Sequence, residues 1–146
     1  MSTYLVSVQK FIPAPAAEIF AIVADPRQHS RIDGSGTVQG TEDTDPQELS
    51  LGSTFTVDMK IGKRYQMTNT VVEYEQDRLI AWKPSGDYVW RYRFEPVTDG
   101  TLVTEEWDAR QSKRRTIMGL LGFRGRNRRG ITRTLERLHD AAVQDS

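Results

Sequence analysis

Three carboxylates near the end of a strand-like segment are the first candidates for chemistry in this sequence. Glu105, Glu106 and Asp108 lie around Trp107. Alternate residues of a strand face opposite sides of a sheet, so one of these acids must share the inward face with Leu102 or Trp107. A carboxyl in an apolar cavity has a raised pKa and can act as a general acid or base. The alternative is that the strand end is solvated and has no catalytic role.

The usual sequence signatures of catalytic and metal sites are not found. Cysteine does not occur, which excludes disulfides, thiolate metal sites and cysteine nucleophiles. The two histidines, His29 and His139, do not form a two-histidine helix motif, and we expect both at the surface. The Gly34-Ser35-Gly36 turn lacks the spacing of a nucleophile elbow. We therefore expect no metal and no cofactor, and motifs alone leave the catalytic residues unknown.

A stripe of aromatic residues has the clearest alternation in the chain. Trp90, Tyr92 and Phe94 alternate with charged residues, which predicts a half-buried strand with its aromatic face toward the C-terminal helix. This face is either ordinary core packing or the wall of a cavity. Buried Tyr and Trp side chains need a partner for their polar tips, and a solvated or ligand-filled pocket can supply one.

The formal net charge is zero, but the charge is unevenly distributed along the chain. Residues 1–109 carry 10 basic and 17 acidic groups, whereas residues 110–146 carry 10 basic and 3 acidic groups. The basic segment is either a solvated helix face, offset by the acidic remainder, or a surface that recognises an anionic headgroup, a membrane or nucleic acid. Aromatic residues do not interleave it beyond Phe123, so we expect no nucleic-acid partner.

We favour the solvated face for this basic segment. A secondary hypothesis is that one of its arginines lies at the mouth of a pocket and selects ligands that carry a carboxylate. The candidates for that position are Arg124, Arg126 and Arg128.

Hydrophobic periodicity predicts the elements that position these residues. Alternation over two residues indicates seven strands. Their ranges are 4–12, 37–41, 54–61, 65–74, 78–83, 90–95 and 101–109. Between the first two strands, residues 16–24 and 26–32 form two short helices, the second capped by Asp25. Residues 42–52 are polar and form a loop.

A long helical segment ends the sequence. Ile131, Leu135, Leu138 and Ala142 recur at helical spacing and form one apolar stripe. We predict helix over about 113–143. Four glycines at 119, 122, 125 and 130 predict a kink or a break, because glycine destabilises a helix interior by roughly 1 kcal/mol relative to alanine.

Length and element order define the fold class. A chain of 146 residues is the size of one domain, so we assign residues 1–146 to a single domain. Consecutive hairpins followed by one amphipathic helix predict an α+β fold, an antiparallel sheet with the helix on one face. The sequence has no secretory signal pattern and no apolar stretch of the ~20 residues that cross a membrane, so we expect a soluble cytoplasmic protein without stable membrane insertion.

This order of elements resembles the START-like, helix-grip superfamily called SRPBCC, which includes polyketide cyclases and dehydrases and START lipid-transfer domains. The resemblance covers nearly the whole chain and is sharpest in residues 12–20, IPAPAAEIF, and residues 23–29, VADPRQH. The turn at residues 99–104, DGTLVT, also matches. Residues 31–36, RIDGSG, stand where many members carry tryptophan, a variant associated with actinobacterial members.

The resemblance implies a curved sheet of about seven strands wrapped around the long C-terminal helix, with a cavity between them. It also implies a small hydrophobic ligand, such as a lipid, a polyketide or an aromatic compound. A cyclase or dehydrase using the same cavity is an alternative, and so is an interaction module acting through the basic segment. Ligand identity and oligomeric state stay open. The side chains expected to line the cavity are Val57, Met59, Tyr65, Met67, Trp82, Trp90, Tyr92, Phe94, Trp107, Met118, Leu121 and Phe123.

Overall fold

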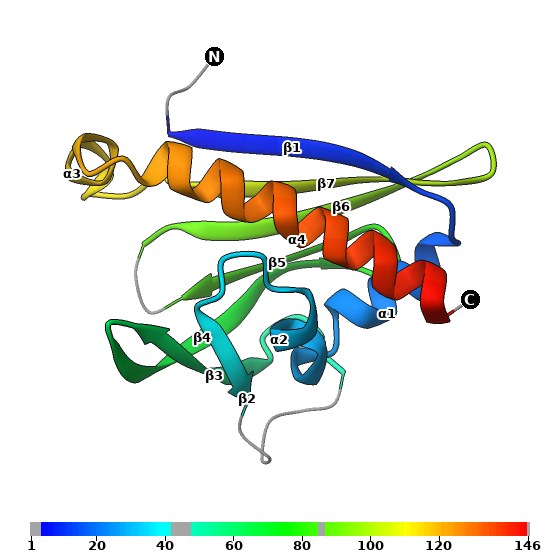
Figure 1. The fold of residues 1–146 in the computed structure, drawn as a ribbon, viewed down its shortest axis with the longest axis horizontal. Helices are drawn as coiled ribbons and strands as arrows, with labels where there is room; N and C mark the ends of the chain where they lie inside the picture. Colours follow the sequence, from blue (N-terminus) through cyan, green and yellow to red (C-terminus); the bar gives the residue numbers. More distant parts are fainter. Residues whose placement is uncertain (1–3, 42–47, 85–86, 146) are drawn as a thin grey trace.

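The computed structural model describes residues 4–41, 48–84 and 87–145. Seven strands and several helices follow one another along the chain, and Figure 1 shows their arrangement. The first part comprises β1 (Leu5–Ile12), α1 (Ala16–Val23), the 3-10 helix η1 (Pro26–Gln28), α2 (His29–Ile32) and β2 (Val38–Thr41). The remainder comprises β3 (Thr54–Ile61), β4 (Lys63–Glu75), β5 (Leu79–Pro84), β6 (Val89–Val97), β7 (Gly100–Asp108), α3 (Arg115–Leu120) and α4 (Phe123–Asp145).

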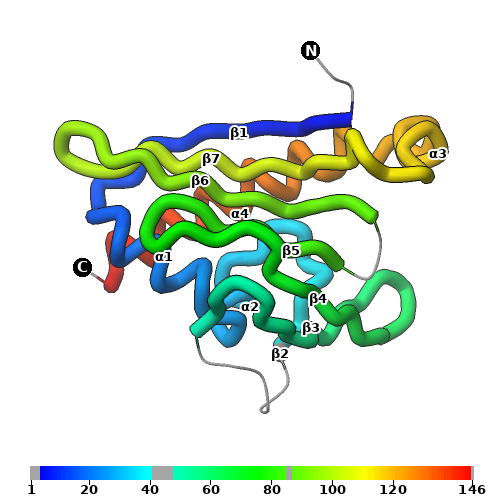
Figure 2. Tube along the Cα trace, turned by 180° about the vertical axis from the view of Figure 1, so that it is seen from behind, coloured from blue at the N-terminus to red at the C-terminus, as the bar shows by residue number. Residues whose placement is uncertain are grey.

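All seven strands belong to one antiparallel sheet. Its strand order is β1-β7-β6-β5-β4-β3-β2, so only the pairing of β1 with β7 joins strands distant in sequence. The sheet curves around the long C-terminal helix, as the two opposite views show (Figures 1 and 2). The structure therefore confirms the α+β fold predicted from the alternating runs and the helix-grip arrangement that the family resemblance implies.

Helix α4 lies across the inner face of the sheet and packs mainly against β1. Its predicted apolar stripe is buried, with Ile131, Leu135, Leu138 and Ala142 all in the core. The stripe packs against one half of the inner face of the sheet, while the first turns of α4 lie farther along that curved face. This asymmetry leaves room for a cavity beside the first half of the helix.

The predicted break in the C-terminal helix occurs at Gly122. Its backbone has a φ of 78°, a left-handed conformation that glycine adopts without steric strain. The break separates α3 from α4, whereas α4 continues through Gly125 and Gly130. Figure 1 shows α3 at the end of the molecule, beyond the sheet.

The two short helices after β1 occupy the predicted positions, and the second one is divided into η1 and α2. The Asp25 side chain accepts a hydrogen bond from the Arg27 backbone amide at 3.0 Å, which is the predicted cap. Helix α1 buries Ile19 and Phe20 in the core. Part of the loop predicted over residues 42–52 lies outside the described residues.

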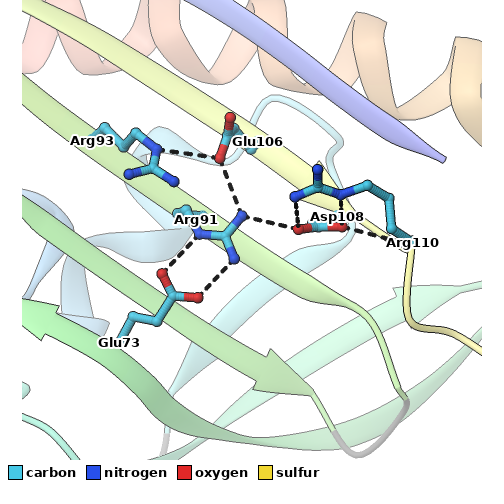
Figure 3. A network of polar contacts seen from close by, with 6 residues as sticks. All are labelled: Glu73, Arg91, Arg93, Glu106, Asp108 and Arg110. Carbon is cyan, nitrogen blue, oxygen red and sulfur yellow. Dashed lines mark hydrogen bonds and ion pairs between the residues drawn. The ribbon is translucent and has the colours of Figure 1, made fainter. Parts of the chain in front are cut away.

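The outer face of the sheet carries a network of charged side chains centred on Arg91, which is only 8% exposed (Figure 3). Its guanidinium binds Glu73 on β4 at 2.7 and 2.9 Å, and Glu106 and Asp108 on β7 at 3.1 Å each. These bonds tie together strands β4, β6 and β7. In the part of the chain that is described, no helix is long and apolar enough to cross a membrane.

Candidate functional site

A cavity of about 360 Å³ lies between the inner face of the sheet, the first half of α4 and the connection from α2 to β2. That volume falls in the range of small-molecule binding pockets. Most of its wall is apolar or aromatic. The apolar residues that line it include Phe55, Val57, Met59, Tyr65, Met67, Trp82, Tyr88, Trp90, Tyr92, Trp107, Met118, Phe123 and Ile131.

Strand alternation explains the aromatic wall. Trp90 and Tyr92 on β6 point inward, and Trp107 stands opposite Trp90 on β7. Trp82 on β5 is paired with Trp90 on its other side, and its ring lies 5.5 Å from that of Tyr92. These residues are far apart in sequence, and the register of three strands brings them to one surface.

A carboxyl group interrupts this apolar wall. Glu105 is 4% exposed and lies directly opposite Tyr92 in the strand register. Its Oε1 atom has no hydrogen-bond partner among the described residues. Burial holds the pKa of Glu105 well above its usual range, the Tyr92 hydroxyl acts in the other direction as a hydrogen-bond donor, and the charge of Asp33 raises the pKa further. The environment therefore favours a neutral carboxyl, which can donate its proton to an oxygen in the cavity.

His29 also lines the cavity, which corrects the expectation that it lies at the surface. It is 7% exposed, and its ring stacks on Trp82 at 4.9 Å and meets Phe55 edge-on. Its Nε2 lies 2.8 Å from the Val23 carbonyl oxygen. Burial lowers the pKa of His29. Because a carbonyl only accepts hydrogen bonds, the neutral ring carries its proton on Nε2 and keeps Nδ1 as an acceptor.

The connection between α2 and β2 closes the cavity against α4. Gly34 packs so tightly on the helix that an added Cβ would lie 2.4 Å from the Thr134 backbone nitrogen. Its own amide donates to Thr134 Oγ1 at 2.8 Å. The Asp33 carboxylate holds the turn by accepting bonds from the Ser35 amide, the Ser35 hydroxyl and the Val38 amide. Glycine at position 34 is therefore a steric requirement of the site.

Three arginines of α4 lie at the cavity opening. Arg126, Arg129 and Arg133 contribute to its lining and are exposed to solvent. The Arg126 guanidinium carbon lies 4.5 Å from the centre of the Phe123 ring. The hypothesis of an arginine at the mouth thus fits Arg126, whereas Arg124 and Arg128 do not line the cavity. Arg129 and Arg133 belong to the basic segment but are not among the residues predicted for the mouth.

A comparison with protein families places this cavity in context. The family model described as "Polyketide cyclase / dehydrase and lipid transport" matches residues 4–143. The chain belongs to this family. Membership of this family supports a ligand-binding fold for the chain.

Two curated relatives of this chain come from Mycobacterium tuberculosis. The protein named "Uncharacterized protein Rv0088" is 38% identical over 135 residues, covering 88% of this chain and 60% of that protein. "Uncharacterized protein MT0096" matches with the same identity and coverage. The chain therefore spans about three-fifths of the length of the curated relatives that it matches. These matches agree with the actinobacterial resemblance noted in the sequence.

Solved structures share the fold at low sequence identity. A protein from Arthrobacter aurescens superimposes with a TM-score of 0.72 at 18% identity, covering 99% of this chain and 88% of that one. Protein Ms6760 from Mycobacterium smegmatis gives 0.68 at 18%, with 99% and 94% coverage. The "Polyketide_cyc-like protein Cgl2372" from Corynebacterium glutamicum gives 0.65 at 20%, with 93% and 89% coverage. These likenesses concern the fold alone.

Ten of the twelve side chains expected at the cavity wall line it, and two do not. Phe94 faces the same side of β6 as Tyr92, but its ring packs edge-on against Phe20 of α1 at 5.4 Å. Helix α1 thus fills the space beyond Tyr92, and Phe94 belongs to the core. Leu121 is 66% exposed. It lies just before the break at Gly122, where only Met118 of α3 turns inward.

The placement of polar groups in the cavity was only partly predictable. Strand alternation requires one of three carboxylates to face inward, and the structure identifies it as Glu105. Among the described residues, no group of three or more His, Asp or Glu side chains is arranged to hold a metal ion.

Proposed function

We propose that this protein binds a small hydrophobic molecule in the cavity between the sheet and α4. The observation that carries the proposal is the cavity of about 360 Å³ itself, whose wall is apolar and aromatic and is interrupted by the Glu105 carboxyl. Burial of the apolar body of a ligand against this wall would favour binding, and the neutral Glu105 carboxyl is a hydrogen-bonding group in the same wall.

The shape of the wall supports a ligand of modest size and mixed character. Met59, Met67 and Met118 supply flexible side chains that adapt to an irregular molecule. Trp82, Trp90 and Tyr92 supply flat surfaces for aromatic or unsaturated groups. An open cavity also argues against the alternative of an interaction module with a closed, filled core.

Native mass spectrometry of the purified 146-residue chain tests this proposal. We expect an added mass that is lost on denaturation and that belongs to a small organic molecule. The delipidated protein should then bind the neutral fluorescent probe N-phenyl-1-naphthylamine with about one probe per chain. Absence of both the added mass and probe binding would contradict a ligand-binding role.

A second candidate function is acid catalysis in the same cavity. The specific observation in its favour is the pairing of Glu105, in an environment that favours the neutral acid, with the Tyr92 hydroxyl. A neutral carboxyl at this position can protonate an oxygen atom of the bound molecule, as a cyclase or dehydrase requires. Once a ligand is identified, Glu105→Gln should retain its binding and abolish its conversion, whereas a purely binding protein would show no conversion at all.

A further inference from the structure

The arginines at the cavity opening point to the chemical class of the ligand. We propose that the cavity binds an amphipathic organic anion, with its apolar body against the aromatic wall and its anionic group held by Arg126, Arg129 and Arg133. This inference rests on the proposed ligand-binding function and makes it more specific. It gives a role to part of the basic C-terminal segment that the fold does not otherwise use.

Helix geometry brings the three arginines to one stripe. They stand at positions i, i+3 and i+7, which share a face of a helix. Gly130 and Thr134 lie beside them on the helix and also line the cavity. Gly130 faces the connection from α2 to β2, where an added Cβ would lie 3.7 Å from the Ser35 Cβ.

These arginines form no ion pair with any of the described residues. In the same described part of the chain Arg124 and Arg128 form none either, whereas Arg110 binds Asp108 at 2.8 Å and Arg114 lies 3.8 Å from Asp87. What distinguishes Arg126, Arg129 and Arg133 is that they also line the cavity. Three like charges on two turns repel one another, and a bound anion would relieve that repulsion.

The two acidic side chains of the cavity wall leave room for an anion. The Asp33 carboxylate already accepts three hydrogen bonds that hold its own turn. Glu105 lies in surroundings that favour its neutral form, so it adds little negative charge. Arg126 stacks over Phe123, which keeps its guanidinium at the edge of the cavity. The opening is thus cationic, and the interior is apolar.

Two fluorescent probes that differ by one charged group test this inference. 1-Anilinonaphthalene-8-sulfonate carries an anionic sulfonate, and N-phenyl-1-naphthylamine is the same skeleton without it. Wild-type protein should bind the anionic probe about tenfold more tightly, as one or two charge-assisted hydrogen bonds would give. Raising the salt concentration should weaken the binding of the anionic probe more than the binding of the neutral one.

A matched pair of double variants locates the effect on the helix. The double variant Arg126→Gln with Arg129→Gln should lower the affinity for the anionic probe about tenfold. It should change the affinity for the neutral probe less than twofold. Arg124→Gln with Arg128→Gln removes the same charge from the same helix outside the cavity, and should change neither probe by more than about twofold. Thermal melts of both variants establish that they are folded.

The possible results separate this inference from the proposed function. If the wild-type protein binds both probes equally, or if the two double variants lose anionic-probe affinity to the same extent, recognition of an anion by these arginines is wrong while ligand binding stands. If neither probe binds the wild-type protein, the proposed function itself fails. The salt dependence of probe affinity in the wild-type protein separates the same two cases without any substitution.

Discussion

Tyr92 and Glu105 stand directly opposite each other on β6 and β7, and both residues line the cavity. The pairing sets a polar group in the middle of an aromatic wall. Burial favours the protonated form of both side chains, since it raises the pKa of the Tyr92 phenol and of the Glu105 carboxyl. Because the Tyr92 hydroxyl donates to Glu105, the pair offers the apolar cavity one hydrogen-bond donor, the neutral Glu105 carboxyl, without adding a full charge.

The pH dependence of stability provides a test of the buried carboxyl. A carboxyl whose pKa is raised by folding stabilises the protein fully below its unfolded pKa, and this contribution is lost as pH rises through the folded pKa. Glu105→Gln removes the titration. We expect the Tm of the variant to gain a few degrees relative to wild type between pH 5 and pH 8, because about 1 kcal/mol corresponds to about 2–4 °C in a chain of this size.

The comparison with wild type removes other pH effects that both proteins share. His29 is one of these, since its lowered pKa makes both proteins less stable as the pH falls below about 6.5. Glu95→Gln, the same substitution at an exposed position on β6, serves as the matched control. A constant difference for Glu105→Gln would show that Glu105 is charged in the folded protein.

Much of the fold could be predicted because each element carries its own local pattern. Trp90, Tyr92 and Phe94 alternate with charged residues, which specifies strand and inward face together. Gly122 marks the break in the helix, because a left-handed backbone there suits glycine alone. The family resemblance implied a cavity, and the same patterns then indicated which strand side chains face it, since the inward face of a strand does not depend on distant residues.

The polar part of the site depends on contacts between distant segments, which a single sequence does not specify. His29 sits in a short polar helix, and its burial comes from Phe55 and Trp82 on strands farther along the chain. Phe94 lies on the inward face, as predicted, and only the position of α1 excludes it from the cavity. For Arg129 and Arg133 a signal existed, since both flank the apolar stripe that begins at Ile131.

Shortening the aromatic wall should weaken ligand binding. We expect Tyr92→Ala to lower the affinity for N-phenyl-1-naphthylamine about three- to tenfold, because the loss of one aromatic contact amounts to about 0.5–1.5 kcal/mol. Phe94→Leu is the control on the same face of the same strand but outside the cavity. It should lower the Tm and leave probe affinity within twofold. Equal affinities for wild type and Tyr92→Ala would count against this wall as the binding surface.

The network on the outer face of the sheet should contribute stability and leave binding unchanged. Arg91→Met leaves Glu73, Glu106 and Asp108 close together without their shared cation, and we expect a loss of about 3 kcal/mol in urea unfolding. Arg93→Met removes an exposed neighbour with a single contact to Glu106 and should cost less than about 1 kcal/mol. A similar loss for both variants would contradict the central place of Arg91.

Protonation of its carboxylates should break the ion pairs of the same network in a defined pH range. The Arg110 and Arg91 guanidiniums lower the pKa of Asp108 to about 2. A carboxyl with a lowered pKa stabilises the folded protein above its unfolded pKa of about 4, and the contribution is lost as pH falls toward 2. The stability gap between wild type and Arg91→Met should therefore be constant from pH 5 to 7 and narrow below pH 4. A gap that widened in acid would refute this assignment.

The approach of Gly34 to α4 should be the most sensitive point in the frame of the cavity. In Gly34→Ala the new methyl group would lie 2.4 Å from the Thr134 nitrogen and 2.5 Å from the Arg133 Cβ, and neither atom can yield without moving the helix. Overpacking of this kind costs about 1–3 kcal/mol.

Because the displaced turn carries Asp33 and Ser35 and packs against Arg133, Gly34→Ala should also bind the anionic probe more weakly. Gly40→Ala is the control, since among the described residues its methyl group would meet only Asp58 Oδ2, at 3.9 Å, and it should change the Tm by no more than about 2 °C. Equal melting temperatures for the two variants would mean that the connection from α2 to β2 does not rest on the helix as the structure shows.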